Sequence, residues 1–227
     1  MARYYKIPER NKGIFSSLSV TSILLLLNVI VFIIALLFGA LNNPNCDETI
    51  CKFIALKPSN ILQGNYLWTF ITSMFMHAGF FHLFVNMLSL FFIGSLVERI
   101  LGKKRYIYFY VISGLLAGLF FVLSSMLFPG DLDAFAVGAS GALFGLVGLL
   151  MFLTPNLPVF VMFIPIPIKM KYAAPGILVL LWLISVTGNV PIGNTAHLGG
   201  LLTGLIYGIY LRNKYRKKIN YLSRYFS

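Results

Sequence analysis

Between Lys57 and Glu98 the chain reads PSNILQGNYLWTFITSMFMHAGFFHLFVNMLSLFFIGSLV, without one charged residue. A helix needs roughly 20 mostly apolar residues to cross the hydrocarbon core of a bilayer. The part of this stretch from Phe80 to Val97 meets that requirement and ends at the charged pair Glu98-Arg99. The stretch therefore predicts a membrane-spanning helix preceded by a shorter apolar segment.

The same pattern holds along the rest of the chain. Further uncharged stretches lie between Lys12 and Asp47, between Asp133 and Lys169, and between Lys171 and Arg212. The sequence is 59% hydrophobic and only 11% charged, whereas about a quarter of the residues in a soluble domain are charged. This composition excludes a soluble domain and predicts an all-α membrane protein.

Turn residues and charge clusters divide these stretches into six predicted spans, which form one compact bundle without an appended soluble domain. A cytoplasmic segment of residues 1–17 precedes the six-span domain of residues 18–211, and a basic cytoplasmic tail of residues 212–227 follows it. The predicted spans are Leu18–Ala40, Phe80–Val97, Tyr106–Phe128, Ser140–Leu153, Ala173–Thr187 and Thr195–Leu211.

The basic residues predict how the bundle is oriented. Of the eighteen Lys and Arg residues, only Lys52 and Lys57 fall in loops on one side of the predicted membrane. Basic residues concentrate on the cytoplasmic side of membrane proteins, so both termini are expected to be cytoplasmic. The net charge of +12 is explained by contact with anionic lipid, and no nucleic-acid partner is needed.

The first outer loop, Asn42–Gly79, is longer than a simple connector. Its second half, Ile61–Met76, is apolar and aromatic, and we expect an interfacial or re-entrant helical segment there. Cys46 and Cys51 lie in the same loop, where a disulfide and two reduced thiols are both compatible with the sequence. Two cysteines without a neighbouring histidine do not predict a metal site, and no cofactor is expected.

A few polar residues within membrane depth are the candidates for function, because such residues are costly in hydrocarbon. His82 and Asn86 are four residues apart on one face of the second span. Ser140 opens the fourth span and His197 opens the sixth. In the predicted topology all four lie at the same shallow depth near the outer surface. His77, at a boundary between loop and helix, is assigned a structural role.

Glycine spacing predicts that the fourth and sixth spans approach closely. Small residues four positions apart allow the backbones of two transmembrane helices to touch, and this contact would bring Ser140 and His197 together. The glycines with this spacing are Gly141 and Gly145 in the fourth span and Gly200, Gly204 and Gly208 in the sixth.

Taken together, these motifs resemble the rhomboid family over nearly the whole chain. The resemblance lies in His82-Leu-Phe-Val-Asn86, in Gly138-Ala-Ser140-Gly141 and in Ala196-His197-Leu-Gly-Gly200-Leu-Leu-Thr-Gly204, in that order. It implies a six-helix rhomboid bundle that hydrolyses peptide bonds within the membrane.

The resemblance also implies roles for the site residues. Ser140 would be the nucleophile and His197 its general base. The oxyanion would be held by the Ser140 backbone N–H and the side chains of His82 and Asn86. All six acidic residues are expected in loops or near the cytoplasmic ends, so a Ser–His dyad is predicted. The Gly138 turn and the close-packing Gly141, Gly200 and Gly204 would support this site.

Two departures from the family pattern are present. Phe144 stands where many relatives have Tyr, and it can stack on His197 but has no hydroxyl group. Trp68 is followed by Thr69, whereas a Trp-Arg pair is common in the family. Neither departure changes the predicted dyad.

The expected substrate is a single-span membrane protein that enters from the lipid between the second and fifth spans, with Val190–Asn194 as a flap over the site. The absence of a transit-like leader before the first span favours a multi-pass protein of a prokaryotic cell membrane. The main alternative is a catalytically inactive relative that binds or escorts membrane proteins. A small transporter or channel is a second one, although such proteins usually carry intramembrane acids.

Overall fold

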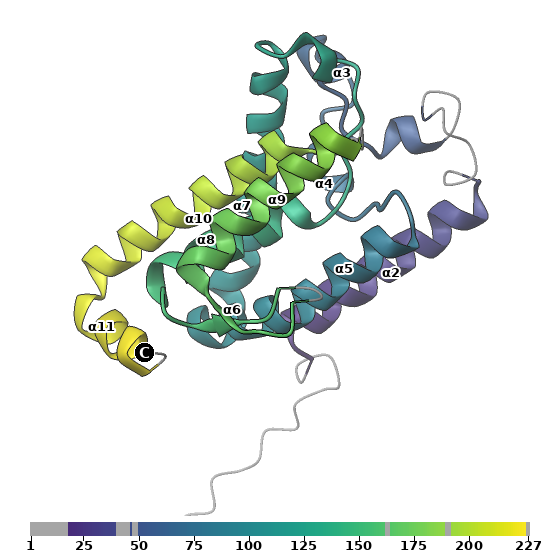
Figure 1. The fold of residues 1–227 in the computed structure, drawn as a ribbon. Helices are drawn as coiled ribbons and strands as arrows, with labels where there is room; N and C mark the ends of the chain where they lie inside the picture. Colours follow the sequence, from purple (N-terminus) through teal and green to yellow (C-terminus); the bar gives the residue numbers. More distant parts are fainter. Residues whose placement is uncertain (1–17, 40–45, 47–49, 162–163, 189–191, 226–227) are drawn as a thin grey trace, which may run out of the picture.

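The computed structural model describes residues 18–39, 46, 50–161, 164–188 and 192–225, and it is mostly helical (Figure 1). The predicted N-terminal segment, residues 1–17, and the start of the predicted flap, residues 190–191, lie outside this part of the chain. The main helices are α2 (Val20–Leu37), α5 (Phe80–Ser89), α6 (Ser95–Leu101), α7 (Lys103–Ser125), α8 (Ser140–Leu153), α9 (Met170–Gly188), α10 (Asn194–Lys214) and α11 (Arg216–Tyr225).

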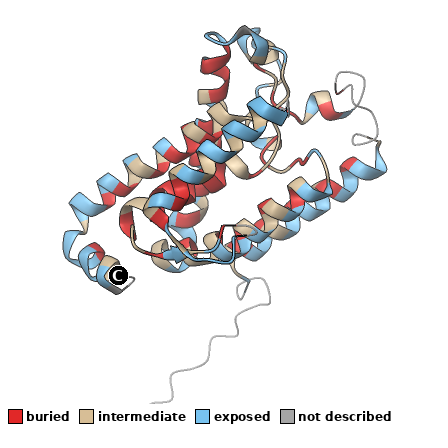
Figure 2. Ribbon diagram, viewed as in Figure 1, coloured by how far each residue is buried: buried red, intermediate tan, exposed pale blue. Residues whose placement is uncertain are grey.

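Helix α8 forms the centre of the core (Figure 2). Its residues are apolar or glycine after the first position, and the run 142–150 is buried throughout. It packs mainly against α10 and α7. Helix α8 has 14 residues, or about 21 Å at the helical rise, which is shorter than the hydrocarbon core of roughly 30 Å.

Glycines make the contact between α8 and α10 possible. A methyl group on Gly200 would overlap the carbonyl oxygen of Gly141, and one on Gly204 would overlap that of Gly145. The two backbones therefore touch at the positions where the sequence predicts close approach.

Helix α2 packs against the continuous helix formed by α5, η3 (Leu90–Gly94, a π-helical turn) and α6. The carboxylate of Glu98, 8% exposed, accepts hydrogen bonds from the backbone N–H groups of Val20 and Thr21 and from the Thr21 hydroxyl. These donors lie in the first turn of α2, where N–H groups have no helical partner. Glu98 therefore anchors the start of α2 to the end of α6.

The outer faces of the helices suit a bilayer. Many large apolar side chains are exposed on α2, α5, α7 and α9. Among the described residues, four helical segments are long and apolar enough to cross a membrane: Val20–Leu37, Phe80–Leu101, Lys103–Ser125 and Met170–Gly188. The chain is therefore a multi-pass membrane protein, and the count of six spans and the orientation of the termini remain predictions.

The helices differ from the second and third predicted spans, mainly at their charged ends. The second predicted span continues to Leu101, and the third begins at Lys103 instead of Tyr106 and ends at Ser125 instead of Phe128. Charged residues do not end these helices, because Lys and Arg extend their stems along a helix and keep the charge in water. The break is at Gly102, whose φ of 78° interrupts the helix.

The first, fifth and sixth predicted spans also differ in their bounds from the helices of the structure. The fifth span occupies Met170–Gly188, longer than predicted, and the first occupies Val20–Leu37, shorter than predicted. Helix α10 continues to Lys214, past the predicted boundary at 211, and the predicted tail contains α11. Only the bounds of α8 agree with the prediction at both ends.

The first outer loop is partly helical, and one short helix, α4 (Thr69–Thr72), lies within the Ile61–Met76 segment where a helix was predicted. The loop also contains η2 (Ile50–Phe53) and a second short helix, α3 (Pro58–Leu62), and the Trp68 indole N–H donates to the carbonyl of Phe53 at 2.8 Å. Cys46 and Cys51 form a disulfide, which settles the alternative that the sequence left open. The chain between α8 and α9 forms an antiparallel pair, β1 (Pro158–Val159) with β2 (Ile168–Lys169), that was not predicted.

Candidate active site

Ser140 is the first residue of α8, and the turn before it fixes its position. Gly138 has a φ of +117°, which residues with a Cβ rarely adopt. Its N–H donates to the carbonyl of Ser73 at 2.8 Å, so the turn is tied to the first outer loop. Ser140 is half-buried and its N–H lies at a helix N-terminus, where developing negative charge is favoured.

His197 lies in the first turn of α10 and contacts this serine. Its Nε2 is 2.8 Å from Ser140 Oγ, and the imidazole is 7% exposed. The ring stacks on Phe144, with 4.5 Å between centroids and an angle of 20°. Packing from α8 therefore orients the histidine toward the hydroxyl.

His82 reaches the same turn from α5. A methyl group on Gly138 would lie 2.8 Å from His82 Cε1, 2.9 Å from its Nε2 and 3.7 Å from Ser140 Oγ. The imidazole of His82 and the hydroxyl of Ser140 thus both lie within 4 Å of the Cβ position at Gly138. A side chain at this position would occupy the space that the two groups face.

Asn86 lies one turn further along α5. Its amide Nδ2 donates to the backbone carbonyl of His82 at 2.8 Å, and the side chain is 4% exposed. An amide NH₂ has two hydrogens, so one donor is held within α5. The structure thus brings Ser140, His197 and His82 around one turn and places Asn86 beneath His82.

His77 contacts this group, which sequence reasoning did not foresee. It is fully buried and its ring meets that of His82 edge-on, with 5.0 Å between centroids. His77 and His82 are five residues apart, but α5 begins between them, so helical spacing does not predict their contact. The structural role predicted for His77 therefore did not include this contact with His82, a candidate site residue.

The loop between α7 and α8 is attached to the first outer loop at several points. Ala136 and Leu56 pair through backbone hydrogen bonds. The Ser59 hydroxyl donates to Asp133 at 2.8 Å, and Lys57 Nζ lies 3.4 Å from the same carboxylate. The Ser59 hydrogen bond, and next the Lys57 contact, hold the pKa of Asp133 below its usual range. These contacts position the chain that leads into Ser140.

Chemically, the arrangement supplies a hydroxyl nucleophile, an adjacent base and a second imidazole beside the nucleophile. The described acids lie elsewhere: Glu98 binds the start of α2, and Asp131 and Asp133 lie in the loop between α7 and α8. Within the described ranges, no group of three or more His, Cys, Asp or Glu side chains is placed to hold a metal ion. Among the residues that the structure describes, the geometry is that of a Ser–His pair with no acidic side chain beside it.

Fold and site together define a class: a multi-pass helical membrane protein with a serine and a histidine paired at the ends of two closely packed helices. A Rhomboid domain is matched over residues 64–214. This chain therefore belongs to the rhomboid family. The matched region contains the helices that carry Ser140, His197, His82 and Asn86.

Individual relatives agree with this assignment. RHOMBOID-like protein 1 of Arabidopsis thaliana is 37% identical over 165 residues, covering 70% of this chain and 38% of the relative. The Rhomboid protease GluP of Bacillus subtilis is 31% identical over 187 residues, covering 81% and 33%. The mitochondrial Rhomboid protein 1 of Saccharomyces cerevisiae is 29% identical over 192 residues, covering 80% and 51%. The chain thus spans between a third and about half the length of these relatives.

Proposed function

We propose that this chain is an intramembrane serine endopeptidase, which hydrolyses a peptide bond in or next to the transmembrane segment of single-span membrane proteins. The observation that carries the proposal is the 2.8 Å contact between Ser140 Oγ and His197 Nε2. Membership of a family in which one relative is named a protease, GluP, supports it.

In this mechanism Ser140 Oγ attacks the scissile carbonyl carbon while His197 Nε2 accepts the hydroxyl proton. The same imidazolium then protonates the departing amine, which leaves an ester on Ser140. Water, deprotonated by His197, attacks that ester and releases the second product. Phe144 keeps the ring of His197 in place through both steps.

The negative oxygen of the tetrahedral intermediate would be bound beside Gly138. The donors are the Ser140 N–H and the imidazole of His82, with the remaining amide hydrogen of Asn86 behind them. One such donor contributes roughly 3 kcal/mol to transition-state stabilisation.

In the proposed topology, water can reach the site from the outer surface. With six spans and cytoplasmic termini, Ser140 lies near the outer surface, where the partial exposure of Ser140 and His82 allows access. The disulfide in the same outer loop is consistent with an oxidising compartment on that side. We propose the prokaryotic cell membrane as the location, and the mitochondrial relative makes an organelle membrane the alternative to test.

The test is cleavage of a purified single-span reporter in detergent by the parent chain, Ser140→Ala and His197→Ala. The parent is expected to cleave the reporter, and kcat is expected to fall on the order of 10⁶-fold in each variant. Cleavage that survives Ser140→Ala would refute the assigned nucleophile. Reporter binding without cleavage by the parent would favour the escort function instead.

A further inference from the structure

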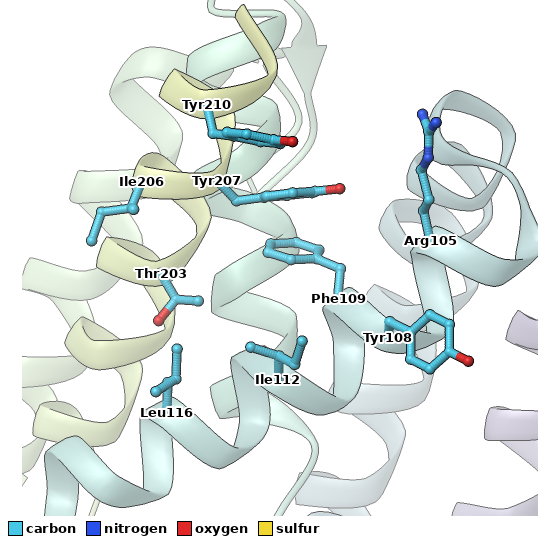
Figure 3. Close-up of a pocket in the computed structure, with 9 residues that line it drawn as sticks. All are labelled: Arg105, Tyr108, Phe109, Ile112, Leu116, Thr203, Ile206, Tyr207 and Tyr210. Atoms are coloured by element: carbon cyan, nitrogen blue, oxygen red, sulfur yellow. The ribbon is translucent and has the colours of Figure 1, made fainter. Parts of the chain in front are cut away.

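A groove on the outer side of the bundle, away from Ser140, runs between α7 and α10. It has a volume of about 350 Å³. Ile112 and Leu116 of α7 and Ile206 of α10 line its apolar part, and all three are exposed. Figure 3 shows Ile112 and Leu116 on one helix and Ile206 on the other. Its lining contributes nothing to the proposed reaction.

Stacked rings make one wall of the groove rigid. Phe109 of α7 stacks on Tyr207 of α10, with 4.7 Å between centroids and an angle of 24°, and Tyr207 stacks in turn on Tyr210. Figure 3 shows the three rings one above the other. The groove is therefore a preformed surface, which reduces the entropy lost when a flexible ligand binds.

Positive charge and phenol groups gather at one end of the groove. Arg105 lines that end, and its Nη2 donates to the Tyr215 hydroxyl at 3.3 Å. Lys214 Nζ donates to the Tyr210 hydroxyl at 2.9 Å. A guanidinium group carries five N–H donors in a planar fork that matches a phosphate. In the part of the chain that the structure describes, no acidic residue lines this groove.

We propose that the groove between α7 and α10 binds an anionic phospholipid of the surrounding bilayer. Its phosphate contacts Arg105 and Lys214, and one acyl chain lies along Ile112, Leu116 and Ile206. From Arg105 to Leu116 the α7 axis rises by roughly 16 Å. This length is close to one leaflet of a hydrocarbon core of roughly 30 Å.

Charge complementarity favours a phospholipid in this groove over a protein partner. A transmembrane helix of a substrate, or a second copy of this chain, would place apolar side chains against Arg105 and Lys214 and leave both cations without an anion. Basic pockets at the ends of transmembrane helices suit anionic headgroups, and each Lys or Arg contributes about a fivefold gain in affinity.

The experiment is native mass spectrometry of the full chain in detergent, titrated with phosphatidylglycerol or with phosphatidylcholine of the same acyl chains. The parent is expected to bind phosphatidylglycerol at least tenfold more tightly than phosphatidylcholine. Arg105→Gln is expected to weaken phosphatidylglycerol about fivefold and to leave phosphatidylcholine unchanged, and Arg105→Lys to retain most of the preference. Ile206→Trp, which fills the apolar part, is expected to weaken both lipids.

Arg99→Gln is the matched control, because Arg99 is an exposed cation near the same end of α7 that does not line the groove. It is expected to bind both lipids like the parent. Equal affinity for the two lipids, or an equal loss in Arg99→Gln and Arg105→Gln, would overturn the proposal. A dimer that Ile206→Trp dissociates, without lipid adducts on the parent, would assign the groove to a second copy.

Discussion

Replacing Gly138 by alanine is expected to impair catalysis through His82 while the chain still folds. The new methyl group would lie 2.8 Å from His82 Cε1 and 2.9 Å from its Nε2. Carbon atoms in ordinary contact are about 3.5–4.0 Å apart, so the imidazole must move by about 1 Å.

That displacement exceeds the narrow range of roughly 2.7–3.1 Å within which the donors of an oxyanion hole lie from the oxyanion. Losing one donor lowers kcat by about 10²–10³-fold. The φ of +117° at Gly138 adds backbone strain of about 1–3 kcal/mol when a Cβ is present. Gly138→Ala is therefore expected to lower kcat about 100-fold and to lower the free energy of unfolding by about 2 kcal/mol.

The assay is reporter cleavage with kcat and KM measured separately, together with thermal unfolding in the same detergent. Gly130→Ala is the matched control, since Gly130 lies in the same loop and a methyl group placed on it would have no atom within 4 Å. The control should retain parental kcat, and Gly138→Ala should keep KM within about twofold because the donor acts on the transition state. A Gly138→Ala chain with parental kcat would refute the role given to His82.

Three other predictions concern stability and pH. Glu98→Ala should lower the free energy of unfolding by about 3 kcal/mol, because it leaves buried N–H donors without an acceptor, and Glu98→Gln should lose less. Gly204→Ala should cost about 1–3 kcal/mol by separating α8 from α10, whereas Gly176→Ala, with open space around it, should not. The Ser59 hydrogen bond depresses the pKa of Asp133. The stabilisation that the Asp133 carboxylate contributes is therefore present above the unfolded-state pKa of about 4 and is lost as the pH falls through the folded-state pKa. The melting temperature of Asp133→Asn should accordingly depend less on pH than that of the parent in this acidic range.

Thermal or denaturant unfolding can contradict each of these three predictions. Equal stability of Glu98→Ala and the parent would mean that the carboxylate does not anchor α2. Equal losses in Gly204→Ala and Gly176→Ala would mean that the close contact of α8 with α10 is unimportant. Superimposable pH profiles for the parent and Asp133→Asn would remove the role of that carboxylate in joining the outer loops.

The sequence predicted the site best where turn residues limit a short apolar helix. Gly138 before Ser140, and Thr154-Pro155 after Leu153, fixed both ends of α8 because these residues disfavour helix continuation. The glycine spacing on α8 and α10 then predicted the contact that brings Ser140 to His197.

Features that depend on tertiary contacts were not predictable from one sequence. The predicted third span began after the basic residues 103–105, which belong to α7. A charged residue occurs both at the end of a transmembrane helix and within its last turns, so the sequence does not distinguish the two cases. The π-helical turn Leu90–Gly94 and the β1–β2 pair have no distinct periodicity. The contact of His77 with His82 depends on the path of the loop before α5.

The central claim, that His197 activates Ser140 as a nucleophile, is tested most directly by covalent labelling. The full chain in detergent would be treated with a fluorophosphonate and the adduct located by peptide mass spectrometry. One adduct is expected on Ser140, formed at least about 100-fold more slowly in His197→Ala and absent from Ser140→Ala. An adduct on another residue, or labelling of Ser140 at the parental rate without His197, would contradict it.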